Sequence, residues 1–310
     1  MKKLPGGLWP VMLTPFDENN KPDLDGLELL IDFYINSGAD GLFANCLSSE
    51  MFELDAEERL TIIKTITRTV NGKIPIIATG TFSKNIKENN KFINQAYDAG
   101  ASALVINTNQ LNDQSDNEDE FREKLEELMK KTGDIPLGLY ECPVPYKRLI
   151  SPGIMKWAAG SGRFLYHKDT SCELTDIESK IEAISGTGLG LYNANTPTAL
   201  ESMNKGAAGL STIGANFFPE LYTYLIKNYN DEKQIARIQK INTFLCVADP
   251  IVHSFYPLSA KKFLQKRGLK ININTRIRVS SMKSQDLIIL NELMNLFKEI
   301  TSQLNLERSI

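Results

Sequence analysis

The first 230 residues alternate between two hydrophobic patterns. Short apolar runs of four to seven residues, typical of buried strands, precede longer stretches in which apolar residues recur every three or four positions, as in amphipathic helices. Within residues 25–37, for example, Leu27, Leu30, Ile31 and Tyr34 fall on one helical face. The pair of patterns recurs eight times, and the predicted strands are residues 7–13, 41–44, 74–80, 103–107, 136–140, 164–168, 189–192 and 209–213.

Local signals predict where several helices begin. Asp55 and Glu58, three residues apart, predict a capping box. Ser151-Pro152 and Thr196-Pro197 predict two further helix starts, because a hydroxyl caps the first turn and proline suits it.

Eight alternating strands and helices imply a parallel sheet with helices outside it. Three helix-to-strand turns, at residues 37–41, 99–103 and 205–209, carry glycine in second place, where a helix ends in a left-handed residue. In open dinucleotide-binding sheets a Gly-x-Gly-x-x-Gly motif follows the first strand, and this sequence has none there. The expected fold class is therefore α/β, a (β/α)8 TIM barrel.

After residue 230 no further strand pattern follows. Helical periodicity recurs in residues 235–247, 260–264 and 287–304, which predicts three helices. Because no linker separates them from the barrel, we expect a barrel at residues 1–230 and, at residues 231–310, a three-helix C-terminal extension of the same domain.

Composition and charge exclude several classes of partner. The net charge of -3 gives no reason to expect nucleic acid, and no apolar run approaches the roughly 20 residues of a membrane span. The N-terminus has no secretory signal, and the four cysteines are scattered without a Cys-x-x-Cys pair, so free thiols in the cytoplasm are expected. With two histidines and no spaced cysteines, we expect no metal site.

Lys168 is the main candidate for chemistry, since working residues in such barrels lie at the C-terminal ends of strands. It ends an apolar strand and would point into the barrel mouth if Phe164 and Tyr166 do. A desolvated amine there loses its proton more easily and becomes a nucleophile towards a carbonyl. The alternative is a loop lysine that reaches solvent or pairs with Asp169.

Other strand ends add candidates with open alternatives. Tyr140 has a phenol that could shuttle protons or simply fill the barrel. His167 should face the helices, as a packed or hydrogen-bonded side chain. Further strand-end candidates are Leu47, Ser48, Asn195, Thr196 and Ser211.

Several motifs together resemble the dihydrodipicolinate synthase and N-acetylneuraminate lyase family. The resemblance covers nearly the whole chain, and the tyrosine and lysine at this spacing are its most specific part. The motifs are Thr14-Pro15-Phe16, Ser48-Ser49-Glu50, Tyr140-x-x-Pro143, Lys168-Asp169-Thr170-Ser171, Asn216 to Glu220 and Tyr256 to Lys261.

The resemblance implies a class I aldolase-like lyase whose substrate is pyruvate or another 2-keto acid. Lys168 would form an imine with the keto acid, and Tyr140 would move protons. The substrate carboxylate would rest on the backbone N–H groups around Leu47 and Ser48, with the Ser48 hydroxyl assisting. No organic cofactor is needed, and the family's usual assembly implies a homo-oligomer, a tetramer or a dimer.

Departures from the family pattern indicate a different second-substrate pocket. Leu47 stands where the family has a hydroxyl that relays protons to the tyrosine, and the second relay tyrosine falls at Gln110 or Leu111. The arginine that grips the second substrate's carboxylate falls near Pro145. Authentic dihydrodipicolinate synthase activity is therefore not expected.

The strand-seven end also departs from the family pattern. Asn195 and Thr196 are candidates for contacts with the distal end of the substrate, with a plain helix cap at Thr196 as the alternative. Two hypotheses about function remain open: a keto-acid lyase, or a catalytically weakened keto-acid or sugar-acid binding protein of the same fold.

Overall fold

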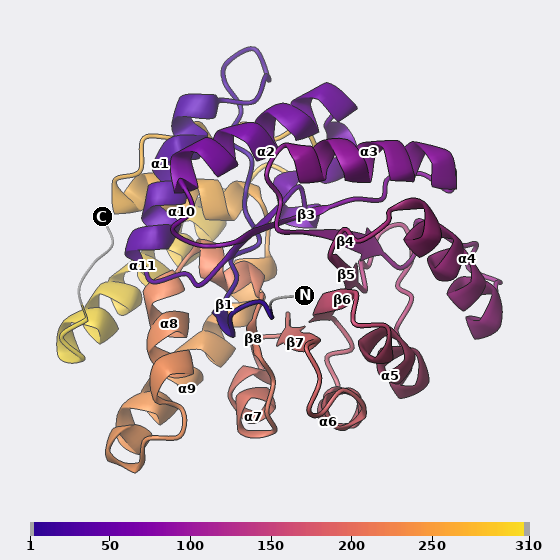
Figure 1. The fold of residues 1–310 in the computed structure, drawn as a ribbon. Coiled ribbons are helices and arrows are strands. Elements are labelled where there is room, and N and C mark those ends of the chain that lie inside the picture. The colour runs from indigo at the N-terminus through magenta and orange to yellow at the C-terminus, as the bar shows by residue number, and fades with distance from the viewer. Residues whose placement is uncertain (1–2, 307–310) are drawn as a thin grey trace.

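The computed structural model describes residues 3–306, in which eight parallel strands form a closed barrel (Figure 1). Residues 1–2 and 307–310, the ends of the expected barrel and extension, lie outside the described part. The sheet runs β1-β8-β7-β6-β5-β4-β3-β2, and Val11, just after β1, pairs with Phe43 in β2 to close it. The strands are β1 (Gly7–Leu8), β2 (Leu42–Ala44), β3 (Ile76–Thr79), β4 (Ala103–Asn107), β5 (Leu137–Tyr140), β6 (Phe164–Asp169), β7 (Gly190–Asn193) and β8 (Gly209–Leu210).

One helix follows each strand, which confirms the predicted (β/α)8 fold. The capping box on α2 is present, since the Asp55 carboxylate accepts from the Glu58 N–H at 2.8 Å and the Glu58 carboxylate from the Asp55 N–H at 3.1 Å. Ser151 caps α5 as predicted. The helices are α1 (Leu24–Asn36), α2 (Ala56–Val70), α3 (Ile86–Asp98), α4 (Glu118–Lys131), α5 (Pro152–Gly160), α6 (Leu174–Ala183), α7 (Ala199–Asn204) and α8 (Pro219–Asn228).

The chain after α8 forms three more α-helices, α9 (Ile235–His253), α10 (Leu258–Arg267) and α11 (Ser284–Gln303). Figure 1 shows them beside α1 and α8. Phe244, Phe263 and Phe297 from these helices pack around Phe218 next to α8, with ring centroids 5.0–5.4 Å from it. Because tail and barrel share this core, we propose that they form one domain.

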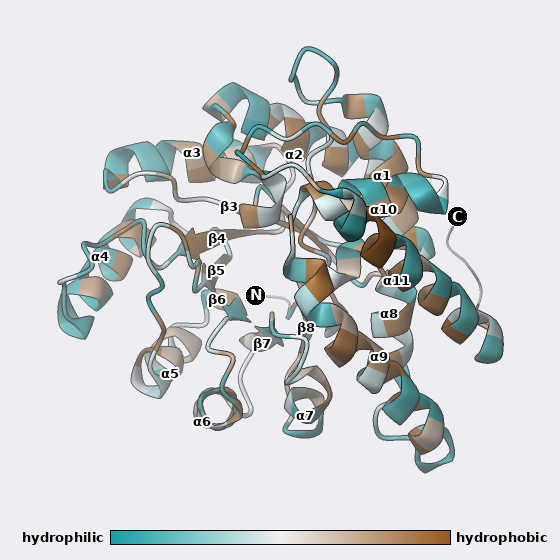
Figure 2. Cartoon of the chain, turned by 180° about the vertical axis from the view of Figure 1, so that it is seen from behind, coloured by the Kyte–Doolittle hydropathy of each residue, from teal (hydrophilic) through white to brown (hydrophobic). Residues whose placement is uncertain are grey.

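The helices that surround the barrel are amphipathic. Figure 2 shows hydrophilic and hydrophobic residues side by side on the outer helices, as expected for helices with one face on a core. Within the described residues, no helix combines the length and the apolar character that crossing a membrane requires.

The interior of the barrel is aromatic. Trp9, Phe43, Tyr140, Tyr166 and Tyr192 belong to one buried cluster inside the strands, distinct from the larger core between strands and helices. Tyr166 and Tyr192 stack with centroids 4.3 Å apart. These rings form the floor beneath the C-terminal ends of the strands.

An irregularity in β6 changes which of its side chains face the barrel interior. Leu137 pairs with Phe164 but Gly138 pairs with Tyr166, so Leu165 has no partner in β5. Phe164 therefore packs outside the barrel, against Trp157, while Tyr166 lies inside. The condition used in the sequence analysis for the direction of Lys168, that Phe164 and Tyr166 both point inward, is therefore met by Tyr166 but not by Phe164.

The predicted helix start at Thr196-Pro197 was also wrong. Helix α7 begins at Ala199, and the Thr198 N–H donates to the side-chain oxygen of Asn195 at 3.1 Å. The Thr196 hydroxyl instead bonds the Tyr222 hydroxyl at 2.9 Å. A tertiary contact has therefore taken the side chain that the local pattern assigned to capping.

Candidate active site

A cavity of about 850 Å³ opens at the C-terminal ends of the strands. Its lining brings together five of the residues singled out in the sequence and one from the tail: Leu47, Ser48, Tyr140, Lys168, Asn195 and Tyr256. This is the end of the barrel at which such folds carry chemistry.

Lys168 reaches the cavity from β6, yet its side chain is almost fully buried, with 3% of the residue exposed. The ion pairs among the described residues do not include it, and Asp169 pairs with Lys180 instead. Burial without a carboxylate partner lowers the pKa of the Lys168 amine from 10.5 to about 8. The amine is therefore partly neutral near neutral pH, as a nucleophile must be.

Tyr140 is the register partner of Lys168 on the neighbouring strand. The Lys168 Nζ lies 4.4 Å from the centroid of the Tyr140 ring. Burial raises the pKa of the Tyr140 phenol well above its usual range, and a hydrogen bond to the Cys142 side chain adds to this. Tyr140 is thus a neutral phenol beside the amine, able to donate or accept a proton.

Residues 47–49 form a short 3-10 helix, η1 (Leu47–Ser49), that enters the cavity after β2. Among the described residues, the hydrogen bonds of this turn use the N–H groups of Ser49 and Glu50 but not those of Leu47 and Ser48. Ser48 is buried, with 4% of the residue exposed, and it lines the cavity together with Tyr256. Two N–H groups and a hydroxyl therefore offer donors at this edge of the cavity.

Two neighbours of Ser48 hold the turn in place. The Ser49 hydroxyl donates to the Met12 carbonyl at 2.6 Å. Glu50 has a left-handed backbone (φ 56°) and a buried carboxylate that accepts from the Lys261 ammonium at 2.9 Å. The same carboxylate accepts a hydrogen bond from the backbone N–H of Arg276 at 2.6 Å. Its charge is thus compensated and the turn is tied to the C-terminal tail.

The remaining sequence candidates lie apart from one another. Asn195 lines the cavity, although its side-chain oxygen is used by Thr198. Thr196 faces Tyr222, as described above. The Ser211 hydroxyl accepts from Tyr166 at 2.7 Å and donates to the Trp9 carbonyl at 2.9 Å, inside the barrel floor. Thr196 and Ser211 are not among the residues that line the cavity.

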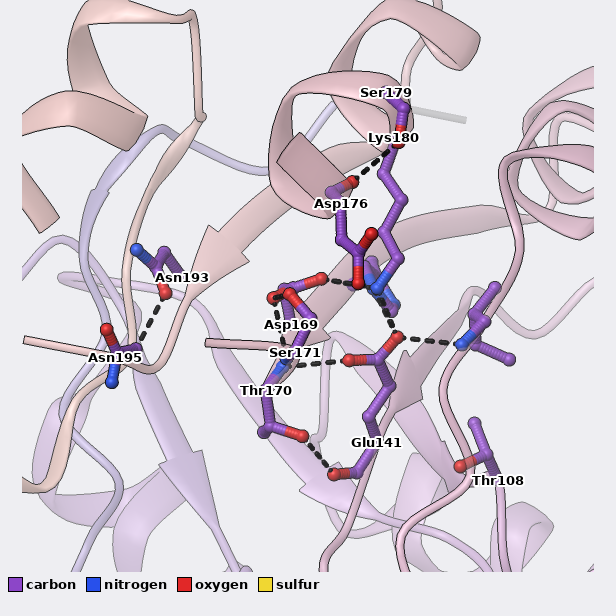
Figure 3. Close-up of polar contacts among 12 residues, drawn as sticks. Thr108, Glu141, Asp169, Thr170, Ser171, Asp176, Ser179, Lys180, Asn193 and Asn195 are labelled. Carbon is purple, nitrogen blue, oxygen red and sulfur yellow. Dashed lines mark hydrogen bonds and ion pairs between the residues drawn. The ribbon is translucent and has the colours of Figure 1, made fainter. Parts of the chain in front are cut away.

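A buried charge cluster lies behind the two central residues, on the helix side of β5 and β6 (Figure 3). The Lys180 ammonium from α6 lies 2.6 Å from both the Glu141 and the Asp169 carboxylates. His167 lies on this side too, as predicted, with its Nε2 3.5 Å from Glu141. Burial alone would lower the pKa of His167, but the two carboxylates raise it above its usual value.

Glu141, His167 and Asp169 could in principle hold a metal ion, since their ligand atoms lie within 4.8 Å of one another. The Lys180 ammonium, however, already bridges both carboxylates where a cation would bind. The cluster therefore fits an internal ion pair better than a metal centre.

Of the positions that indicate a different second-substrate pocket, all but one line the cavity. Leu47, Gln110 and Pro145 line the cavity, whereas Leu111 is buried in the core at 1% exposure. No arginine belongs to the cavity lining among the described residues. Lys147 does, with its Nζ 2.7 Å from the Thr170 carbonyl.

Sequence reasoning assigned no role to Tyr256 and Lys180. The signal for Tyr256 was its place in a recognised motif, but nothing local shows that it reaches the barrel mouth. Lys180 carried no signal beyond being a lysine on the inner face of a predicted helix.

Comparisons with known proteins agree with the geometry. The model of the dihydrodipicolinate synthetase family matches residues 4–296. A 4-hydroxy-tetrahydrodipicolinate synthase of Bacillus subtilis is 26% identical over 267 residues, which cover 86% of this chain and 90% of the relative. One of Methanothrix thermoacetophila is 22% identical over 302 residues, covering 96% and 99%.

A solved structure shares the fold. A prophage protein of the dihydrodipicolinic acid synthase family from E. coli K12, in complex with pyruvate, matches with a TM-score of 0.85 and 22% identity, and covers 94% of this chain and 98% of its own.

Proposed function

The chain belongs to the dihydrodipicolinate synthetase family and is a Schiff-base-forming lyase, and on this premise we propose that it acts on a 2-keto acid of the pyruvate type through an imine on Lys168. The observation that supports this most strongly is the buried, carboxylate-free amine of Lys168 beside the Tyr140 phenol at the barrel mouth.

In the proposed reaction, the neutral Lys168 amine attacks the keto carbon and water leaves, giving an iminium. The iminium draws electrons from C3, so a proton or a carbon–carbon bond there breaks to leave an enamine. Tyr140 gives and takes the protons of these steps. Because the iminium is itself the electron sink, the proposed chemistry requires neither a metal nor an organic cofactor.

The proposed place for the substrate carboxylate is the turn at Leu47 and Ser48. Two backbone N–H groups and the Ser48 hydroxyl are hydrogen-bond donors there, and a carboxylate only accepts. Asn195 is the proposed contact for the distal part of the substrate, since its side chain lines the cavity. The cavity lining gives no support to direct roles for Thr196 and Ser211.

We further propose that the second substrate is not aspartate semialdehyde. Leu47 and Pro145 present apolar surface, and Gln110 has no phenol, where that synthase reaction uses a hydroxyl, an arginine and a tyrosine. A site that lacks the charged partner of a carboxylate discriminates against it.

A panel of 2-keto acids with aldehydes of varied polarity tests the function, with pyruvate release or consumption followed by a coupled assay. Turnover of at least one pair supports the lyase, and robust turnover of pyruvate with aspartate semialdehyde contradicts the proposed pocket. Keto-acid or sugar-acid binding without turnover across the panel supports the alternative of a catalytically weakened binding protein, which the loss of the relay hydroxyl at Leu47 favours.

We propose a homo-oligomer, a tetramer or a dimer, on the family's usual assembly, and a cytoplasmic location, since Cys46 and Cys142 are buried free thiols. Sedimentation velocity at micromolar concentration tests the assembly, and a monomer contradicts it.

A further inference from the structure

We propose that the second substrate of this site is an aldehyde with an apolar body of roughly the size of a benzene ring, and that Ile277 of the C-terminal tail is a specificity-determining residue for it. The inference rests on the proposed function and deepens it, because it names the class of compound that meets the keto acid. In the reverse direction, the same site cleaves a 4-hydroxy-2-keto acid with an apolar substituent on C4.

The cavity leaves room for a second compound beside the keto acid. At about 850 Å³ it has the size of a pocket for a drug-sized ligand, and a three-carbon keto acid fills only a small part of it. The lining extends from Lys168 and Tyr140 on the strands to Pro257 and Ile277 in the tail. The remaining space is available to the compound that reacts with the enamine.

Most of the lining surface is apolar. Leu47, Phe52 and Ile213 pack against the aromatic cluster of the barrel interior and are only partly buried. These three side chains line the cavity, as do Val144 and Ile277. Contact with such side chains removes the apolar surface of a ligand from water, which favours the binding of an apolar compound.

The charged side chains of the lining add little for an anionic or hydroxylated substrate. The Lys147 ammonium donates to the Thr170 carbonyl at 2.7 Å, and the buried Glu50 carboxylate is compensated as described above. Glu53 and His253 also line the cavity, but both are exposed, where charges contribute little. A pocket that leaves the polar groups of a substrate unpaired discriminates against that substrate.

Ile277 is held at the cavity by backbone hydrogen bonds. Its N–H donates to the Glu50 carboxylate at 2.9 Å, and its carbonyl accepts from the Thr275 hydroxyl at 3.1 Å. Neither hydrophobic cluster of the described chain includes its partly buried side chain. The side chain is thus fixed beside the cavity while its apolar surface remains available to a ligand.

The proposed step is an aldol addition. The C3 carbon of the enamine forms a bond with the carbonyl carbon of the aldehyde, whose oxygen becomes a hydroxyl. One proton leaves C3 as the enamine forms and one joins the aldehyde oxygen, so the two transfers cancel. Water then hydrolyses the iminium, which restores the Lys168 amine and balances the water lost in imine formation. The sum adds the keto acid to the aldehyde, and nothing is oxidised or reduced.

Three aldehydes of different polarity test the substrate class. Benzaldehyde is apolar, 4-carboxybenzaldehyde adds a charge to the same ring, and glyceraldehyde is hydroxylated. Each is offered with pyruvate to the unaltered enzyme, to Ile277→Asn and to Ile277→Thr, and kcat/KM is obtained from the aldol product by mass spectrometry. Ile288→Asn is the matched control, because Ile288 lies on α11 with 60% of the residue exposed and does not line the cavity.

We expect kcat/KM for benzaldehyde to exceed that for either polar aldehyde by about tenfold or more. Ile277→Asn should lower the benzaldehyde value about tenfold, the scale of a lost apolar contact in a substrate pocket, and the glyceraldehyde value less than about twofold. Ile277→Thr should act in the same direction. Ile288→Asn should change neither value.

A preference for glyceraldehyde or 4-carboxybenzaldehyde in an enzyme that forms an imine with pyruvate would overturn the inference and leave the proposed function standing. An equal loss for all aldehydes, or a loss of the folded state, in both Ile277 variants would assign Ile277 to stability and overturn its role in specificity.

Trapping of pyruvate with borohydride separates the two proposals. If the unaltered enzyme traps no pyruvate, the proposed function fails. In that case, or if pyruvate is trapped but no aldehyde reacts, saturation-transfer NMR with benzyl alcohol and glycerol decides the inference, since neither compound needs an imine. Binding of benzyl alcohol that Ile277→Asn weakens supports the inference. No binding, or binding that the variant leaves unchanged, contradicts it.

Discussion

Lys168 and Tyr140 are register partners on adjacent strands, with the amine 4.4 Å from the centroid of the phenol ring. Parallel pairing places both side chains at one height on the inner face of the barrel, so the proposed nucleophile and the proposed proton donor are positioned by backbone hydrogen bonds and not by a loop. The face of the Tyr140 ring also attracts the ammonium form of Lys168 and so offsets a part of the free-energy cost of burying that charge.

Tyr140→Phe should slow turnover far more than it weakens keto-acid binding. The substitution keeps the ring and removes only the proton-transferring hydroxyl, and such a loss typically costs ~10²–10⁴-fold in rate. Steady-state kinetics with the substrate pair found in the panel provide kcat and KM. A variant with near-normal kcat would assign Tyr140 to packing alone.

The rate of imine formation should rise with pH up to about 8 and then level off. The attacking species is the neutral amine, and burial lowers the pKa of Lys168 to about 8. Below that pH the neutral fraction falls about tenfold per pH unit, whereas an ordinary lysine would continue to gain up to about pH 10.4. Single-turnover trapping between pH 6 and 10 measures this. A rate that still rises steeply above pH 9 would contradict the lowered pKa.

Lys168→Met should make the protein more stable at neutral pH. The folded-state pKa of Lys168 lies below its unfolded value, so the unfolded chain binds more protons between about pH 8 and 10.5. Below about pH 8 the buried ammonium of Lys168 destabilises the folded state by about 3 kcal/mol, and this cost disappears as the pH rises through the window. Urea unfolding should show the largest advantage of the variant below pH 8 and a shrinking one towards pH 10.5. An unstabilised variant at pH 7 would argue that the ammonium is well solvated.

Lys180→Met should destabilise the fold strongly. The substitution leaves the Glu141 and Asp169 carboxylates buried without their ammonium partner, and breaking such a pair costs about 3–5 kcal/mol. Lys205→Met is the matched control, because the Lys205–Glu178 pair is exposed and should contribute little to the free energy of unfolding. Equal effects of the two substitutions on the free energy of unfolding would show that the buried cluster contributes nothing special.

Features set by neighbouring residues were predictable from the sequence. The Asp55–Glu58 capping box and the Ser151 cap were predicted correctly, because helix ends depend on residues three positions apart. The eight strand–helix units followed from hydrophobic period alone. The strand-end positions of Lys168 and Tyr140 followed from the same count.

Features set by distant residues were not predictable. The register shift that leaves Leu165 without a partner in β5 depends on how two strands pair, and it places Phe164 and Tyr166 on opposite sides of the sheet. Thr196 is held by Tyr222, 26 residues away, and so does not cap a helix. Glu50 and Lys261 are 211 residues apart, and no local pattern shows that they meet. The same holds for Tyr256, whose place at the cavity depends on the packing of the tail.

The most direct test of the central claim is reductive trapping of the substrate on Lys168. The enzyme is incubated with pyruvate, or with the keto acid that it turns over, and borohydride, and the adduct is located by peptide mapping. We predict one adduct per chain, on Lys168, and none in Lys168→Arg, since a guanidinium stays protonated and cannot form the imine. A turned-over keto acid trapped on a different lysine, or turnover that survives in Lys168→Ala, would contradict the mechanism.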